Sequence, residues 1–253
     1  MPGRNYFWAL ILISCSCASL FHRENDFERG LRLYKNKQYS EAVDYFESYH
    51  QQHPDFDSTL YYLFNCYKHL SKHQEQISVL ERLASRDVKD ENVYLNLVYY
   101  YRKHEMFNDL YTLLLNSPPQ IKEALDENLT LTRGFFAELI CGATAQNAQT
   151  DAMTYCISKA YLPLFPDGQM YYDDTLTFAH LIVLLDRLVD PDYPRHFFPM
   201  KNVSTKSYLY LPYMRLIDYG ILEFEAYLIP EQPVPVTAAV SSIAQLVKRG
   251  RFD

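Results

Sequence analysis

Glycine is scarce in this chain: only seven of its 253 residues are glycines. A backbone cradle for phosphate groups needs a glycine-rich loop, so no such cradle is expected. The sequence also lacks the HExxH pattern of zinc proteases and the GxSxG pattern of serine hydrolases. The acidic stretch "DGQMYYDD" lacks the ligand spacing of a calcium loop. We therefore predict that the protein is not an enzyme and uses no cofactor or metal.

An excess of positive charge is also missing. The chain has 24 Lys and Arg against 31 Asp and Glu, which gives a formal net charge of −7. Nucleic-acid binding needs a basic surface that can neutralise phosphates, so nucleic acid is not an expected partner. Hydrophobic residues make up 48% of the chain, and 23 tyrosines and 15 phenylalanines accompany a single tryptophan. This composition predicts a folded protein with aromatic contacts between helices.

The cysteines form no CxxC pair, so a structural zinc site is not expected. There are five of them, at Cys15, Cys17, Cys66, Cys141 and Cys156. A disulfide between Cys141 and Cys156 is one interpretation if the compartment is oxidising. The other interpretation is two buried thiols that pack as small hydrophobic groups.

No long hydrophobic run marks a membrane span near the N-terminus. The apolar stretch Tyr6–Ile13 is less than half of the roughly 20 residues that a spanning helix needs. Arg4 precedes this stretch and small residues follow it, which is typical of an export signal. We therefore predict that residues 1–14 are a signal peptide.

The end of the stretch, Leu12-Ile13-Ser14-Cys15, resembles the lipobox of bacterial lipoproteins. The resemblance implies cleavage before Cys15 and acylation of Cys15, followed by a tether over residues 15–22. Acyl chains would anchor the protein to a membrane of the cell envelope. Because Ser16 follows the cysteine, the resemblance favours the outer membrane or cell surface in a cell with two membranes.

A 34-residue repeat follows in residues 23–120. Tyr39, His73 and Phe107 share one register. Hydrophobic residues at helical spacing predict a mainly α fold with three pairs of helices. The predicted ranges are 24–36 and 40–52, then 58–70 and 74–86, then 91–103 and 107–116.

These units resemble tetratricopeptide repeats, and the first unit carries the family pattern at Gly30, Tyr39, Ala42, Phe46 and Pro54. The later units depart from it, with Phe64 and Val98 in place of Gly30, and Gln76 and Leu110 in place of Ala42. The resemblance implies a helical-hairpin solenoid whose concave face, lined by the first helix of each unit, binds a protein or peptide. The alternative is that its tyrosines pack against neighbouring units. The predicted partner-binding residues are Tyr34, Tyr61, Asn65, Lys68, Asn96, Tyr99 and Arg102.

Residues 121–150 are predicted to cap the solenoid, with a short helix and then a longer one around 128–145, and to end in a linker. Residues 151–253 show a second repeat, with a spacing of 60. Its predicted helices cover 151–162, 177–190, 207–219 and 237–249. Thr177 and Thr237 are the expected N-caps, and Gly220 is expected to end a helix.

This C-terminal region resembles a small domain of two degenerate S-layer homology repeats, on the strength of Phe165-Pro166-Asp167-Gly168 followed by Thr177. The resemblance implies contact with peptidoglycan or its attached wall polysaccharide, and Asp167, Tyr171 and Tyr172 are the candidate polymer-binding residues. In that family an arginine after the threonine holds the anionic polymer. The starts "TFAH" and "TAAV" at Thr177 and Thr237 both lack it.

Together these patterns predict a lipid-anchored envelope protein that acts as a protein-interaction scaffold and contacts the cell wall through its C-terminal region. The alternative is an assembly factor or subunit of an envelope complex that binds only proteins. A third interpretation is an enzyme whose site lies at the domain junction.

Overall fold

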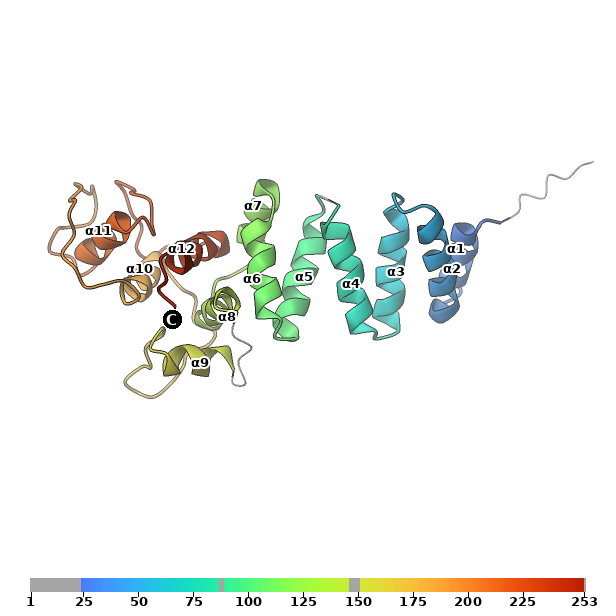
Figure 1. The fold of residues 1–253 in the computed structure, drawn as a ribbon, viewed down its shortest axis with the longest axis horizontal. Coiled ribbons are helices and arrows are strands. Elements are labelled where there is room, and N and C mark those ends of the chain that lie inside the picture. The colour runs from blue at the N-terminus through green and yellow to red at the C-terminus, as the bar shows by residue number, and fades with distance from the viewer. Residues whose placement is uncertain (1–23, 87–88, 146–150, 253) are drawn as a thin grey trace, which may run out of the picture. The chain divides into compact units, whose positions relative to one another are not determined.

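The computed structural model describes residues 24–86, 89–145 and 151–252, and these residues form twelve α-helices joined by loops and turns (Figure 1). The described residues contain no β-strand, only two isolated bridges. The predicted signal peptide, Cys15 and the tether lie outside them. None of the described helices has the length and apolar character that a membrane span requires. The predicted mainly α fold is confirmed.

The chain forms two compact units, the first ending at Lys72 and the second beginning at His73. The first unit contains α1 (Asp26–Lys35), α2 (Tyr39–Gln52) and α3 (Ser58–His69), and each helix packs on the next. Gly30 allows the close packing of α1 on α2, because a Cβ atom at this position would lie 2.7 Å from a ring carbon of Phe46. The glycine of the repeat pattern at position 30 thus has a steric cause in this unit.

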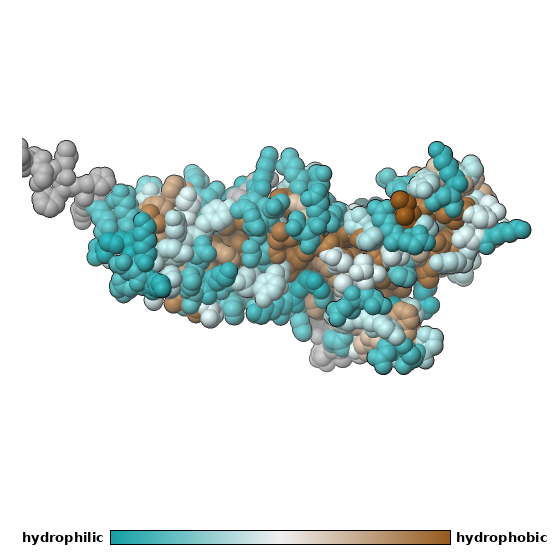
Figure 2. Space-filling model, turned by 180° about the vertical axis from the view of Figure 1, so that it is seen from behind, coloured by the Kyte–Doolittle hydropathy of each residue, from teal (hydrophilic) through white to brown (hydrophobic). Residues whose placement is uncertain are grey.

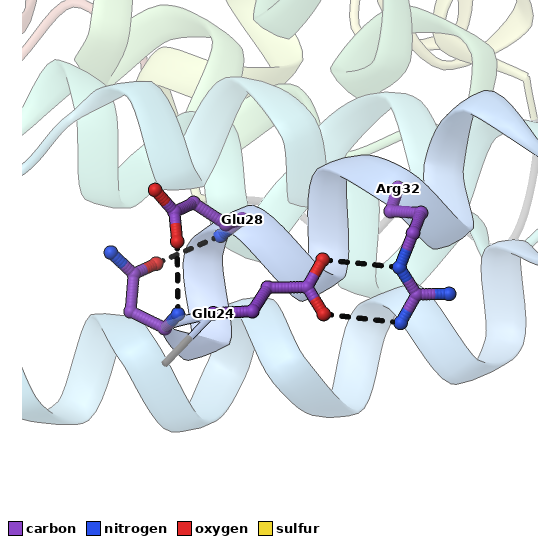
Figure 3. Close-up of polar contacts among 4 residues, drawn as sticks. Glu24, Glu28 and Arg32 are labelled. Atoms are coloured by element: carbon purple, nitrogen blue, oxygen red, sulfur yellow. Dashed lines mark hydrogen bonds and ion pairs between the residues drawn. The ribbon is translucent and has the colours of Figure 1, made fainter. Parts of the chain in front are cut away.

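Polar contacts fix where α1 begins (Figure 3). The backbone N–H of Glu28 donates to the side-chain oxygen of Asn25 at 2.8 Å, and the Glu28 carboxylate accepts from the backbone N–H of Asn25 at 3.0 Å. This capping box satisfies two donors that the first turn leaves free. Glu24 also forms an exposed two-bond ion pair with Arg32, at 3.0 and 3.2 Å.

The turn after the first helix of each pair has the same backbone geometry. Lys37, Ser71 and Glu105 lie 34 residues apart and have positive φ angles of 62°, 56° and 56°. At each turn the next N–H reaches back five residues, as in the 3.0 Å bond from Gln38 to the carbonyl of Leu33. This is the hydrogen-bond pattern of a Schellman helix end. The backbone therefore repeats with the period that the sequence predicts, as in a helical-hairpin solenoid.

The second unit holds the remaining helices, which are α4 (His73–Ala84), α5 (Glu91–Lys103), α6 (Phe107–Asn116), α7 (Pro119–Asn128), α8 (Arg133–Ala143), α9 (Ala152–Ser158), α10 (Phe178–Asp186), α11 (Tyr210–Asp218) and α12 (Val236–Lys248). The segment predicted to be helical around 128–145 begins later, because Thr132 caps α8. The predicted domain boundaries at 120 and 150 both fall inside this unit.

Helix α8 lies at the hydrophobic centre of the second unit. It packs against α6, α9 and α12, and ten of its eleven residues are buried. Gly142 lets α8 approach α6 closely, because a Cβ atom there would lie 2.0 Å from the backbone oxygen of Phe107. A segment predicted to cap the solenoid is thus covered in turn by the C-terminal helices.

The N-cap predictions had different outcomes. Thr177 caps α10 as expected, since its hydroxyl accepts from the backbone N–H of His180. Thr237 does not cap α12, and the prediction was wrong: the helix begins at Val236, and Thr237 donates its N–H to Asp126 of α7 at 2.9 Å. The carboxylate of a distant helix therefore supplies the acceptor. Gly220 ends α11 with φ +60°, as predicted.

We expect Asp126→Ala to lower the free energy of unfolding of the second unit by about 1–2 kcal/mol, the usual cost of losing a helix-capping side chain. Urea unfolding followed by circular dichroism would measure the change. Glu127→Ala is the matched control, because it removes an exposed carboxylate from the same helix. Equal midpoints for the two variants would contradict this role of Asp126.

Candidate functional site

The first unit contains four of the predicted partner-binding residues. The Tyr34 ring packs edge-on against the rings of Tyr39 and Tyr62, with centroids 5.6 and 5.3 Å apart. The side-chain amide of Asn65 donates to the carbonyl of Tyr61 in its own helix at 2.9 Å. Lys68 is exposed on α3. Tyr34 therefore contributes to packing within the unit, and Lys68 is the most accessible of the four.

The second unit contains the other three. The amide of Asn96 donates to the carbonyl of Asn92 at 2.7 Å, and Tyr99 has 57% of its surface exposed beside the ammonium group of Lys103. Arg102 is engaged inside the unit: its guanidinium forms two bonds to the buried carboxylate of Glu138, at 2.5 and 3.1 Å. It therefore joins α5 to α8, and its charge is already compensated.

The predicted polymer-binding loop is closed by its own side chains. Asp167 accepts from the backbone N–H of Gln169 at 2.9 Å and from the hydroxyl of Tyr171. The bond from Tyr171 lowers the pKa of Asp167 and raises the pKa of Tyr171. The Tyr171 ring also packs edge-on against Phe165, with centroids 4.8 Å apart. The loop therefore presents a preformed surface of one carboxylate and two rings.

Tyr172 belongs to a different environment, at the start of α8. Its carbonyl accepts from the N–H of Gly134 at 2.8 Å, and its ring occupies the space where a Cβ atom of Gly134 would be. Burial raises the pKa of the Tyr172 hydroxyl to about 12. Tyr172 thus links the loop to α8 while part of its ring stays exposed.

The starts of α8, α10 and α12 are joined by backbone hydrogen bonds in one repeated pattern. The N–H of Leu176 donates to the carbonyl of Leu131 at 2.9 Å, and the N–H of Val234 donates to that of Leu176 at 3.0 Å. The first two N–H groups of α8 donate to the loop carbonyls at 174 and 172, and those of α10 donate to the carbonyls at 232 and 230. The loop before α10 therefore satisfies free donors of α8, and the loop before α12 satisfies free donors of α10.

A hollow of about 330 Å³ lies between the starts of α8 and α10. Its wall is mainly hydrophobic and is formed by Phe165, Leu176, Val183, Leu184 and Tyr208, among others. Such a volume falls within the range of small ligand sites, and apolar walls with a few polar groups are typical of them.

Arg133 is the buried charged group of this hollow, and the exposed Asp174 also lines it. The residue is 4% exposed, its guanidinium lies 4.6 Å from the centre of the Phe165 ring, and it donates to the carbonyl of Pro163. Among the described residues, Arg133 has no ion-pair partner and its Nε has no acceptor. Burial lowers the pKa of Arg133, and the nearby Asp174 carboxylate partly opposes this. A positive charge without a paired carboxylate is therefore held in a hydrophobic wall.

Arg133 is not among the residues predicted from the sequence, because an arginine was expected only after Thr177 and Thr237. The signal is the pair Thr132-Arg133 at a helix start, where the Thr132 hydroxyl accepts from the N–H of Phe135 at 3.2 Å. Thr132 and Thr177 are both N-caps with the same backbone surroundings. The helix starts at α8 and α10 are therefore structural equivalents.

The buried cysteines are free thiols. Cys141 donates to the carbonyl of Ala152 at 3.8 Å, and Cys156 donates to the carbonyl of Ala137 at 3.6 Å. The two sulfurs therefore face each other across α8 and α9 as thiols that pack in the core. In the part of the chain that the structure describes, no cluster of three or more His, Cys, Asp or Glu could hold a metal ion.

Comparisons with models of known protein families, with curated proteins and with solved structures found no match to this chain. The helical-hairpin architecture is compatible with the tetratricopeptide resemblance. The lipobox and the S-layer homology resemblance remain predictions.

Proposed function

We propose that the protein is a lipid-anchored scaffold of the cell envelope that binds a protein through its helical repeats and an anionic cell-wall polymer through its C-terminal helices. The observation that carries the proposal is Arg133, a buried positive charge in the hydrophobic wall of a hollow, with no ion-pair partner among the described residues. An anionic group that enters the hollow would compensate this charge.

The helix starts support this assignment. In the S-layer homology resemblance, a threonine followed by an arginine opens the helix that holds the anionic polymer. Thr132-Arg133 has this order at the start of α8, and the backbone pattern joins α8 to α10 and α12. We infer that α8 provides the arginine that α10 and α12 lack.

Exposed hydrophobic side chains support a binding role for the same region. Among the described residues most of the large exposed ones lie between positions 164 and 247, and Figure 2 shows hydrophobic atoms on the surface of this part, at the right of the view. Tyrosine rings offer apolar contact area with a polar tip, which suits sugar and protein surfaces. Tyr208, 72% exposed, brings such a ring to the hollow itself.

The repeats provide the protein-binding part of the proposal. Helical-hairpin arrays bind extended peptides or helices on the surface of their first helices. In the second unit Tyr99 with Lys103 on α5 offers an exposed aromatic and basic contact. In the first unit Lys68 on α3 offers an exposed basic contact. An acylated Cys15 would hold both contacts at the membrane, so modest affinities would suffice through a high effective concentration.

The test is co-sedimentation of the full chain with purified cell-wall sacculi from the source organism, with attached polymers either kept or stripped. We expect the wild type to sediment, and Tyr208→Ser and Arg133→Lys to be retained at least several-fold less. Tyr227→Ser is the matched control, because it removes another exposed tyrosine, which does not line the hollow. Circular dichroism would confirm that each variant is folded.

Equal retention of Tyr208→Ser and wild type would contradict polymer binding at this hollow. If no variant and no wild type sediments, we would favour the alternative of an assembly factor that binds only proteins. One observation favours that alternative: α12 packs against α6, α7 and α8, so the C-terminal helices are part of the same compact unit as the later repeats.

A further inference from the structure

We propose that a second hollow in the C-terminal region, of about 270 Å³, binds a phosphate group. Three arginines line it: Arg195 from the loop before α11, Arg215 from α11, and Arg249 from the end of α12. The proposal does not rest on polymer binding at Arg133, because the two hollows share no lining residue.

The loop that carries Arg195 is fixed to α11 by one carboxylate. Asp218 accepts from the backbone N–H groups of Arg195 and His196, the latter at 3.2 Å, and from the ring Nδ1–H of His196 at 2.6 Å. Burial opposes ionisation here, but these hydrogen bonds outweigh it and lower the pKa of Asp218. The carboxylate thus stays charged with its acceptor positions occupied, and it holds Arg195 at the rim.

The position of Arg249 depends on a glycine. Gly220 has φ +60° and ends α11, and a Cβ atom there would lie 3.1 Å from Nη2 of Arg249. The missing side chain leaves room for the guanidinium beside the end of α11. Arg195 and Arg249 therefore reach one hollow from elements that are far apart in sequence.

The charges of the hollow are unevenly compensated. Arg215 pairs with Asp186 at 3.0 Å. Asp192 and Asp218 are the two carboxylates that line the hollow, and Asp192 accepts from the Tyr219 hydroxyl at 3.4 Å. In contrast, the side chains of Arg195 and Arg249 have no ion pair or hydrogen bond with any described residue. The hollow therefore holds two guanidinium groups that an incoming anion can pair with, alongside the carboxylates of Asp192 and Asp218.

The arrangement favours phosphate over a carboxylate. A guanidinium group binds two oxygens through parallel hydrogen bonds. A carboxylate offers two oxygens in one plane, whereas a tetrahedral phosphate offers oxygens in several directions. The two available guanidinium groups, those of Arg195 and Arg249, come from different elements and match the tetrahedral group better. Tyr193, 73% exposed at the rim, provides a ring for the organic part of a phosphate ester.

The experiment is a titration of the full chain with inorganic phosphate at pH 7.5, followed by calorimetry, with chloride adjusted to keep the ionic strength constant. We expect saturable binding that the double variant Arg195→Gln, Arg249→Gln weakens at least tenfold. Arg187→Gln is the matched control, since it removes one exposed arginine that lies outside the hollow. It should bind phosphate as the wild type does.

A second titration with dimethyl phosphate would identify the source of the group. Binding of both probes would indicate a phosphodiester ligand, and binding of inorganic phosphate alone would indicate a free phosphate or a monoester. No saturable binding of either probe, or equal affinity in the double variant and wild type, would overturn the proposal. Polymer binding at Arg133 is measured separately, by co-sedimentation with sacculi. A failure of phosphate binding would therefore leave that proposal testable, and the reverse also holds.

Discussion

Gly142→Ala is expected to destabilise the second unit by about 3 kcal/mol, although the same exchange on an exposed helix face stabilises a protein by about 1 kcal/mol. The added Cβ atom would lie 2.0 Å from the backbone oxygen of Phe107 and 2.8 Å from Cβ of Tyr111. Neither atom is the end of a flexible side chain, so α8 must move away from α6. Urea unfolding should show a clearly lower midpoint.

The same substitution at two other glycines distinguishes the steric clash from the other effects of adding a Cβ atom. At Gly134 the new Cβ would meet the ring of Tyr172 at 2.1 Å, and this partly exposed ring can move, so Gly134→Ala should cost less. Gly250 has φ +62° and no described atom within 4 Å of a new Cβ, so Gly250→Ala should cost only about 1 kcal/mol of backbone strain. If Gly142→Ala lowers the unfolding midpoint no more than Gly250→Ala does, the result would contradict the close contact between α8 and α6.

The helices were largely predictable from the sequence, because hydrophobic spacing depends on residues close together in the chain. The predicted pair 91–103 and 107–116 matches α5 and α6 at both ends. The positive φ angles at Lys37, Ser71 and Glu105 were not predicted, since no glycine marks them. Their 34-residue spacing, however, follows from the repeat that was seen.

The candidate site was much less predictable, because its parts are far apart in sequence. The hollow at Arg133 needs Pro163 and Phe165 from one loop and Tyr208 from another segment. Asp126 replaces the expected threonine cap of α12 from a position 111 residues away. No local pattern reports such contacts, whereas the start of α8 at Thr132-Arg133 was a local signal that could have been read.

The two hollows make different demands on a ligand. The one at Arg133 combines a single buried charge with hydrophobic walls, which favours a small anionic group on an apolar or sugar framework. The one at Arg195 and Arg249 is polar, and its charges lie nearer to solvent.

Arg102→Gln is expected to lower the free energy of unfolding of the second unit by about 2 kcal/mol. The change leaves the Glu138 carboxylate, which is only 7% exposed, without its ion-pair partner. Breaking a fully buried pair costs about 3–5 kcal/mol, and the expected value is smaller because a third of the Arg102 side chain is exposed. Arg32→Gln is the matched control: it breaks the exposed two-bond pair with Glu24 and should leave the unfolding midpoint close to that of the wild type.

A double variant distinguishes a structural role of Arg102 from the predicted partner-binding role. If the loss comes from the unpaired carboxylate, Glu138→Gln added to Arg102→Gln should restore much of the stability, because both charges are then gone. Arg102 was predicted to contact a partner, and that role needs no effect on stability at all. If Arg102→Gln unfolds at the same urea concentration as the wild type, Arg102 is free to contact a partner, whereas loss and rescue would assign it to the contact between α5 and α8.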